Sequence, residues 1–243
     1  MKIAILADIH ANSTAFTEVL NHIETQNVQE FIFLGDLVIN GPSPKEVFEQ
    51  IRDIKPMVWI KGNTDEWFLE INGQWEPKSV NELKLYELFH FSKERLSEQD
   101  IEFIKKLPFS ESIKLNNVTL ICVHGSPRNI SEAMTSELPD YKILQMIEGV
   151  EEEVILCGHS HVSTNRKIEN KMIFNPGSVG FPMDGDSRAS YGILEIRDNG
   201  DIEFFINRIP YDLNENLRTA KLRKFPYLNE YEKKMRYATS RID

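Results

Sequence analysis

The sequence of 243 residues has little of what marks the unusual classes of protein. Its 12 glycines and 11 prolines are too few for a collagen-like or disordered chain. It has only two cysteines, Cys122 and Cys157, and their spacing does not suggest a zinc site. Each lies within an apolar, strand-like stretch, so we expect two buried, reduced thiols. The length fits a single domain over residues 1–243.

No long hydrophobic run opens the chain. The N-terminal sequence MKIAILADIH holds only a five-residue apolar run before Asp8, which is shorter than a signal peptide or a membrane span requires. We therefore expect a cytoplasmic protein that does not enter a membrane.

Positive charge is also scarce, because 28 Lys and Arg stand against 38 Asp and Glu, for a net charge of −10. Nonspecific nucleic-acid binding relies on clustered Lys and Arg, so this class of function is disfavoured, whereas small phosphorylated ligands remain possible. Residues 212–243 are an exception, with eight Lys and Arg against five Asp and Glu. We predict that this segment is helical and that its charged face is solvated. The alternative is that it forms a docking surface, such as the interface of a homodimer.

Short β-rich stretches alternate with helical patterns, which is typical of an α/β fold built from crossover units. The five expected strands are 2–8, 31–36, 57–63, 118–124 and 153–159. Helices are expected at 14–27 and 43–54, and a mostly helical insert at 68–107 is predicted to cover one side of the site. Two later hairpins, turning near 169–170 and 199–200, predict antiparallel strands that form a second sheet or extend the first.

Each of the five expected strands ends in side chains that can bind metal: Asp8, His10, Asp36, Asn63, His124, His159 and His161. In open α/β sheets, ligands gather at the carboxyl ends of the strands, so these side chains can converge on one crevice. Imidazole, carboxylate and amide groups suit Mn, Fe or Zn better than Mg or Ca. Seven ligands exceed the needs of one tetrahedral ion but serve two ions if Asp36 bridges them.

Single residues of these types usually have structural roles, and only the coincidence at five strand ends favours a metal site. His22 and His90 lack that context and are expected to be structural. Trp67 and Trp75 are expected to pack in the core, with a substrate pocket as the alternative. Asn12 is predicted to cap the following helix.

The ordered blocks DIH, GD, GNTD, VHG and GHSH, between residues 8 and 161, resemble the pattern of calcineurin-like metallophosphoesterases. The stretches DIHAN, LGDLVINGPSPKEV, VHGSPR and NPGSVGFPMDGDSRASY resemble the bacterial branch related to diadenosine tetraphosphate hydrolases and small phosphodiesterases. The resemblance covers nearly everything except the 68–107 insert and the last thirty or so residues. It implies a four-layer α/β/β/α sandwich with two facing mixed sheets.

The resemblance also implies two transition-metal ions, Mn or Fe, with Zn as an alternative. One ion would be held by Asp8, His10, Asp36 and His161, and the other by Asp36, Asn63, His124 and His159. A hydroxide bridging the two ions would attack phosphorus, so the reaction needs no protein nucleophile. The implied substrates are phosphoanhydrides or phosphodiesters.

One position departs from the family pattern, because many relatives have a histidine where this chain has Thr64. That histidine is thought to assist the leaving oxygen, so its absence favours leaving groups that depart as stable anions. Dinucleoside polyphosphates such as diadenosine tetraphosphate (Ap4A) have such leaving groups. Thr64 and Asp65 are candidate helpers of the reaction.

Arg128 and Arg188 are candidate phosphate-binding residues, because Arg forks suit phosphate oxygens. An equal alternative is that they pair with nearby acids such as Asp184 or Asp186 and brace their loops. Two other functions remain possible for the whole chain, a protein serine/threonine phosphatase and a non-catalytic scaffold. Scaffold members tend to lose metal ligands, whereas all seven positions are filled here.

Overall fold

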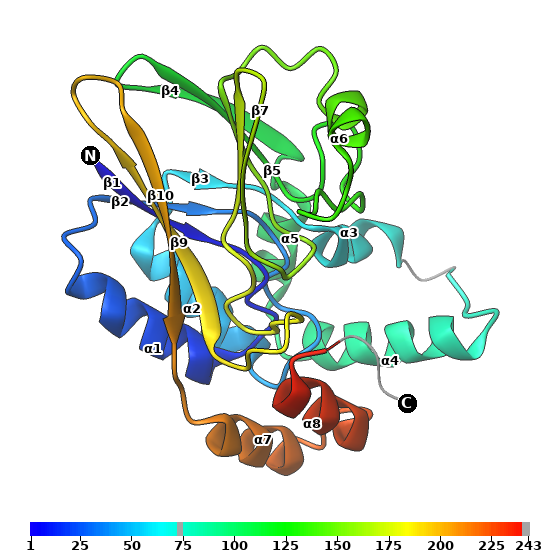
Figure 1. Cartoon of the computed structure of the whole chain (residues 1–243). Helices are drawn as coiled ribbons and strands as arrows, with labels where there is room; N and C mark the ends of the chain where they lie inside the picture. The colour runs from blue at the N-terminus through cyan, green and yellow to red at the C-terminus, as the bar shows by residue number, and fades with distance from the viewer. Residues whose placement is uncertain (72–74, 240–243) are drawn as a thin grey trace.

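The computed structural model describes residues 1–71 and 75–239 (Figure 1). Within these residues, ten strands form two five-stranded sheets, in the orders β10-β9-β1-β2-β3 and β4-β5-β6-β8-β7. The strands are β1 Lys2–Leu6, β2 Glu30–Phe33, β3 Val58–Trp59, β4 Ser110–Leu115, β5 Val118–Val123, β6 Val154–Leu156, β7 Thr164–Ile168, β8 Lys171–Asn175, β9 Ala189–Ile196 and β10 Ile202–Ile209. The helices are α1 Ser13–Glu24, α2 Pro44–Ile54, α3 Asn63–Glu70, α4 Val80–Lys93, α5 Glu98–Lys105, α6 Asp140–Met146, α7 Leu213–Leu222 and α8 Leu228–Tyr237.

Both sheets are mixed, and alternate residues of their central strands face different layers. In β1, which pairs in parallel with β2 and antiparallel with β9, Ala4 and Leu6 pack in the hydrophobic core on the helical side. Ile3 and Ile5 face the core between the two sheets. A strand buried on both faces reads as a continuous apolar run, as KIAIL does.

The two sheets pack face to face, and helices cover their outer faces (Figure 1). Leu120 and Cys122 of β5 contribute to the core between the sheets, while Ile155 and Cys157 pack on the opposite face with α6. The predicted four-layer α/β/β/α sandwich with two mixed sheets is therefore confirmed. Both cysteines are free and buried, as expected, and burial raises the pKa of the Cys157 thiol to about 12.

The late hairpins are confirmed, and each joins a different sheet. β9 and β10 extend the first sheet through β1, whereas β7 and β8 belong to the second. The expectation that these late strands are antiparallel holds within each hairpin and for β9 beside β1, but β8 runs parallel to β6. Two elements were not expected from the sequence: β4, a partly exposed edge strand, and the seven-residue helix α6.

The expected helices form at α1 and α2, and helices also form in the insert and at the C-terminal end. Asn12 caps α1 as predicted, since its side chain accepts a hydrogen bond from the backbone of Ala15. Helices α4 and α8 are side by side, joined by an ion pair between Lys84 and Glu230. Within residues 1–71 and 75–239, no helix combines the length and the apolar character that crossing a bilayer needs.

Candidate metal centre

The side chains at the strand ends sit on strained backbone. Five of the seven predicted ligands have a positive φ, between 46° and 65°: Asp8, His10, Asp36, His159 and His161. This left-handed conformation is uncommon for residues other than glycine and is concentrated at functional sites. Here the sharp turn after each strand directs the side chain toward the neighbouring strand ends instead of along its own strand.

Two glycines allow the ends of β2 and β3 to meet. Gly35 has a φ of 93°, and a Cβ atom there would lie 2.3 Å from the backbone nitrogen of Gly62. A Cβ atom on Gly62 would lie 2.1 Å from Oδ1 of Asp36. The glycines of the GD and GN blocks therefore bring Asp36 and Asn63 together, because any side chain would push the two turns apart.

Four of the predicted ligands form a buried cluster. Each of them offers a ligand atom within 4.8 Å of those of the others, and none is more than 5% exposed: Asp8, His10, Asp36 and His161. Asp8 Oδ1 is buried and accepts no hydrogen bond from the described residues. A buried carboxylate oxygen without a donor is costly unless a cation satisfies it.

The histidines of this cluster are held in one tautomer. Nδ1 of His10 lies 2.9 Å from the carbonyl oxygen of Ile39, and Nδ1 of His161 contacts the carbonyl oxygen of Phe181. A carbonyl oxygen only accepts, so each Nδ1 carries a hydrogen and each Nε2 points into the cluster. The two Nε2 atoms face each other at 3.1 Å. Two nitrogens at this distance need a proton or a metal ion between them.

A second group of donors adjoins the first. His124 donates from Nδ1 to the carbonyl oxygen of Leu34 at 2.7 Å, which leaves Nε2 3.1 Å from Oδ1 of Asn63 and 3.6 Å from Oδ2 of Asp36. Nδ1 of His159 lies 2.8 Å from the same Asn63 oxygen. Because Asp36 also lies 3.5 Å from His10, it is a carboxylate common to both groups, and it is nearer to both histidines than Asp8 is.

The electrostatics of the cluster favour bound positive charge. Burial opposes ionisation of Asp8, but the surrounding histidines, His161 most of all, hold the pKa of Asp8 well below its usual range. Burial likewise opposes charge on His124, yet the neighbouring Asp36 raises the pKa of His124 to about 9. Metal ions satisfy the same demand by displacing protons from such ligands. The carboxylate, imidazole and amide donors gathered here therefore fit the binding of metal ions.

A model of the calcineurin-like phosphoesterase superfamily domain matches residues 1–199. The chain belongs to this superfamily. The superfamily match covers all seven predicted ligands, and the chain is a hydrolase that acts on phosphoester bonds, with a buried cluster able to hold a metal ion.

Several proteins are similar to this chain in sequence or in fold. An uncharacterized protein of Methanocaldococcus jannaschii is 29% identical over 228 residues, which cover 88% of this chain and 89% of that protein. The phosphodiesterase YfcE of Escherichia coli is 24% identical over 207 residues, or 80% and 88% of the two chains. A metallophosphoesterase of Sphaerobacter thermophilus has the same fold, with a TM-score of 0.78, 24% identity and coverage of 98% and 99%. A hypothetical protein of Pyrococcus horikoshii also shares it, with a TM-score of 0.85, 23% identity and coverage of 99% of both chains.

Thr64, where many members of the superfamily have a histidine, lies in the first turn of α3. Its backbone N–H donates to Oδ1 of Asp36 at 2.9 Å, so the residue borders the shared carboxylate. Thr64 is only 4% exposed, and its hydroxyl has no hydrogen-bond partner in the described part of the chain. An unpartnered buried hydroxyl is costly, and this one lies beside the candidate metal centre.

Asp65 has a different environment from the one expected of a proton donor. Its carboxylate accepts hydrogen bonds from the backbone nitrogens of Asp36 at 2.8 Å, Leu37 at 3.2 Å and Gly62 at 2.9 Å. Burial and the charge of Asp36 raise the pKa of Asp65 to about 6, while the three backbone donors favour the ionised form. These contacts support a positioning role, in which Asp65 fastens the turn after β2 to the start of α3.

The two candidate arginines are exposed and paired with acids. Arg128 forms an ion pair with Glu132 at 2.6 Å and donates to the carbonyl oxygen of Gln145. Arg188 pairs with Asp186 at 2.6 Å. These ion pairs are the contacts expected if the arginines brace their loops. To bind phosphate, either arginine would first have to break its ion pair with the acid.

The remaining candidates occupy structural positions. His22 of α1 lies 2.7 Å from the hydroxyl of Tyr191, and His90 of α4 packs against Tyr86. Trp67 and Trp75 pack against the hydrophobic core on the helical side, as expected. Sequence reasoning missed the carbonyl groups of Leu34, Ile39 and Phe181 that orient the histidines, because a backbone acceptor has no signature in residue type.

Proposed function

We propose that this protein is a binuclear metal-dependent phosphohydrolase that cleaves phosphoanhydride or activated phosphodiester bonds, with nucleotide-type compounds such as Ap4A as substrates. The main support is the geometry of the histidines, whose Nε2 atoms face each other or the Asn63 oxygen beside a shared carboxylate. Such a set of donor atoms needs positive charge among them, and divalent metal ions supply it.

In this proposal, Asp8, His10, Asp36 and His161 hold one ion. Asp36, Asn63, His124 and His159 hold the other. Bound there, the ions would activate a shared water and offset negative charge on the phosphoryl group. The chain itself contributes orientation: backbone carbonyls fix the tautomers of three histidines, as second-shell partners of metal ligands commonly do. Mn or Fe is the proposed metal, with Zn as the alternative.

The substrate class follows from the residue at position 64. A threonine hydroxyl is a poor general acid near neutral pH, so an alkoxide leaving group would depart slowly, by a factor of about 10²–10⁴. A phosphate or nucleotide leaves as a stable anion without that proton. The relationship to the phosphodiesterase YfcE supports a small phosphorylated substrate, without identifying it.

The first prediction concerns metal and leaving group together. Chelated protein should have no measurable hydrolase activity, and Mn or Fe should restore it. With metal bound, kcat/KM for Ap4A should exceed that for a simple alkyl monophosphate by about 10²-fold or more, because only the second substrate needs a proton. Steady-state assays across a phosphoester panel measure both effects. A clear preference for the monoester would contradict the substrate assignment, and metal-free protein that takes up no transition metal would favour the scaffold alternative.

The second prediction concerns the Thr64 hydroxyl, which we propose hydrogen-bonds a phosphate oxygen of the substrate. Thr64→Val keeps the shape of the side chain and removes a buried group without a partner, so thermal stability should be unchanged or higher. Loss of the substrate contact should lower kcat/KM for Ap4A about 3- to 10-fold. Thermal unfolding and Ap4A kinetics test the two parts. Unchanged kinetics would show that the hydroxyl does not assist the reaction.

The cytoplasmic location, the homodimer and the organisation of residues 1–243 as one domain stay predictions.

A further inference from the structure

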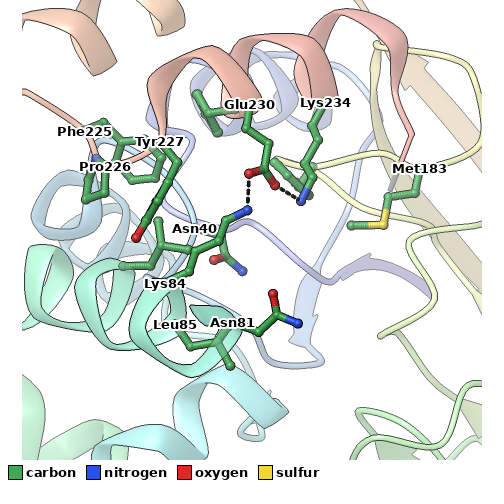
Figure 2. A pocket seen from close by; sticks show the side chains of 13 residues that line it. Asn40, Asn81, Lys84, Leu85, Met183, Phe225, Pro226, Tyr227, Glu230 and Lys234 are labelled. Carbon is green, nitrogen blue, oxygen red and sulfur yellow. Dashed lines mark hydrogen bonds and ion pairs between the residues drawn. The ribbon is translucent and has the colours of Figure 1, made fainter. Parts of the chain in front are cut away.

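A pocket of about 300 Å³ lies beside the metal centre, where the insert meets the C-terminal helices (Figure 2). Asn81, Lys84 and Leu85 of α4 form one wall, and Tyr227, at the start of α8, faces them. Both helices belong to the segments outside the resemblance to the metallophosphoesterase pattern. The volume is at the lower end of the range for small-molecule sites, and is enough for one nucleoside-sized group.

The floor of the pocket is formed by a residue that contacts two of the predicted metal ligands. Phe181 lines the pocket, and its ring lies edge-on to the rings of His10 and His161, with centroid distances of 5.7 and 5.9 Å. Its carbonyl oxygen accepts the hydrogen bond from His161. On the other side, Asn40 follows Ile39, whose carbonyl oxygen orients His10. A ligand in the pocket is therefore separated from the metal cluster by a single layer of side chains.

The walls carry aromatic rings suited to a flat partner. Phe181 and Tyr231 are stacked, with an interplanar angle of 18°, and Phe225 packs against Tyr231. Tyr227 is 37% exposed and has a φ of 54°, so the chain holds a large aromatic residue in a strained conformation at the pocket. Strain of this kind persists where a function maintains it. Its ring also lies 5.2 Å from the ammonium group of Lys84.

Two amides in the pocket are free for recognition. The side chains of Asn40 and Asn81 make no hydrogen bond to any of residues 1–71 or 75–239, and both line the pocket (Figure 2). An asparagine amide offers one donor group and one acceptor, which matches the paired donor and acceptor on the edge of a nucleobase. An aliphatic ligand would use neither group, and a purely anionic ligand would use only the donor.

The charges in the pocket nearly cancel. Glu230 pairs with Lys84 and with Lys234, at 2.9 Å for the second pair (Figure 2). The acid neutralises one of the two cations, so the pocket has only a small excess of positive charge. This arrangement suits an uncharged ring better than a chain of phosphates, which would meet a carboxylate between the two lysines.

We infer that this pocket binds the nucleobase of the substrate, between the rings of Tyr227 and its aromatic neighbours and against the amides of Asn40 and Asn81. The inference rests on the proposed phosphohydrolase function and narrows it to compounds that carry a heteroaromatic base. Helices α4 and α8 thus give this chain a specificity that the shared metal centre does not supply.

The test compares Ap4A with tripolyphosphate, an anhydride without a base, in the Mn-loaded enzyme. Tyr227→Ala should lower the ratio of kcat/KM for Ap4A over tripolyphosphate about tenfold, the effect of losing one base-stacking partner. Asn81→Ala, at an exposed helical position, should lower the ratio about threefold. Tyr227→Phe, which keeps the ring, and Tyr237→Ala, at an exposed tyrosine of α8 outside the pocket, should retain the wild-type ratio.

A ratio that stays at the wild-type value in Tyr227→Ala and Asn81→Ala would overturn the inference. If kcat/KM also falls equally for both substrates, the pocket holds the phosphate chain and not the base. If neither anhydride is hydrolysed, the proposed function is wrong. The base site can then still be tested by measuring adenosine binding with calorimetry. Binding to the wild type that weakens about tenfold in Tyr227→Ala supports the base site. Failure of the wild type to bind adenosine overturns it.

Discussion

Asp36→Asn should lower kcat/KM for Ap4A by about 10³-fold or more and reduce the metal content of the purified protein. Asp36 lies nearer to both donor groups than Asp8 does, at 3.5 Å from His10 and 3.6 Å from His124 against 3.7 and 3.9 Å for Asp8. An amide offers one neutral oxygen in place of two charged ones, so it cannot bridge two cations as strongly. Each metal contributes several kcal/mol of transition-state stabilisation, and about 4 kcal/mol corresponds to 10³-fold.

A matched control is Asp198→Asn, the same substitution at an exposed residue of the β9–β10 turn. It should keep wild-type metal content and kinetics. Elemental analysis of both proteins, followed by Ap4A assays over a range of Mn concentrations, separates weaker metal binding from impaired chemistry. If Asp36→Asn retained two ions per chain and full activity, Asp36 would not be the bridging ligand.

The metal centre could be predicted from the sequence because its residues are tied to strand ends. Strand ends are visible as the points where apolar runs stop, and parallel strands place these points at one edge. The structure brings all seven predicted residues together, although they follow β1, β2 and β3 of one sheet and β5 and β6 of the other. What the strand pattern could not supply was the local backbone, such as the left-handed φ of Asp8 and His161. That conformation follows from tertiary contacts between neighbouring turns, not from residue type.

The pocket could not be predicted, for a related reason. Asn40, Lys84 and Tyr227 come from three separate parts of the chain, and only the packing of α4 against α8 brings them together. The short strand β3 shows another limit. The expected strand at 57–63 shrinks to Val58–Trp59 because the chain turns at Gly62 and begins α3 at Asn63. Contacts to Asp65 fix that turn, and they involve backbone groups 28 and 29 residues away.

Asp65→Ala should destabilise the protein by about 3–5 kcal/mol, a large fraction of the stability of a typical domain. The substitution leaves the buried N–H groups of Asp36, Leu37 and Gly62 without an acceptor, and each such group costs about 1–3 kcal/mol. Chemical denaturation measures the loss. Asp100 provides the control, since it occupies the equivalent third position of α5 and accepts from the backbone of Ser97 near solvent. Asp100→Ala should cost only about 1 kcal/mol.

Asp65→Asn distinguishes the positioning role from proton transfer. An amide oxygen at the Oδ2 position can still accept the two hydrogen bonds from Asp36 and Gly62 but not the one from Leu37, so the stability loss should fall between those of the wild type and Asp65→Ala. Activity should decline in step with that loss, because the turn that carries Asp36 is less firmly held. A proton donor would give the opposite pattern, since the isosteric amide would preserve stability while removing the transferable proton. Asp65→Asn with wild-type stability and activity at least 10²-fold lower would therefore assign Asp65 to the reaction itself.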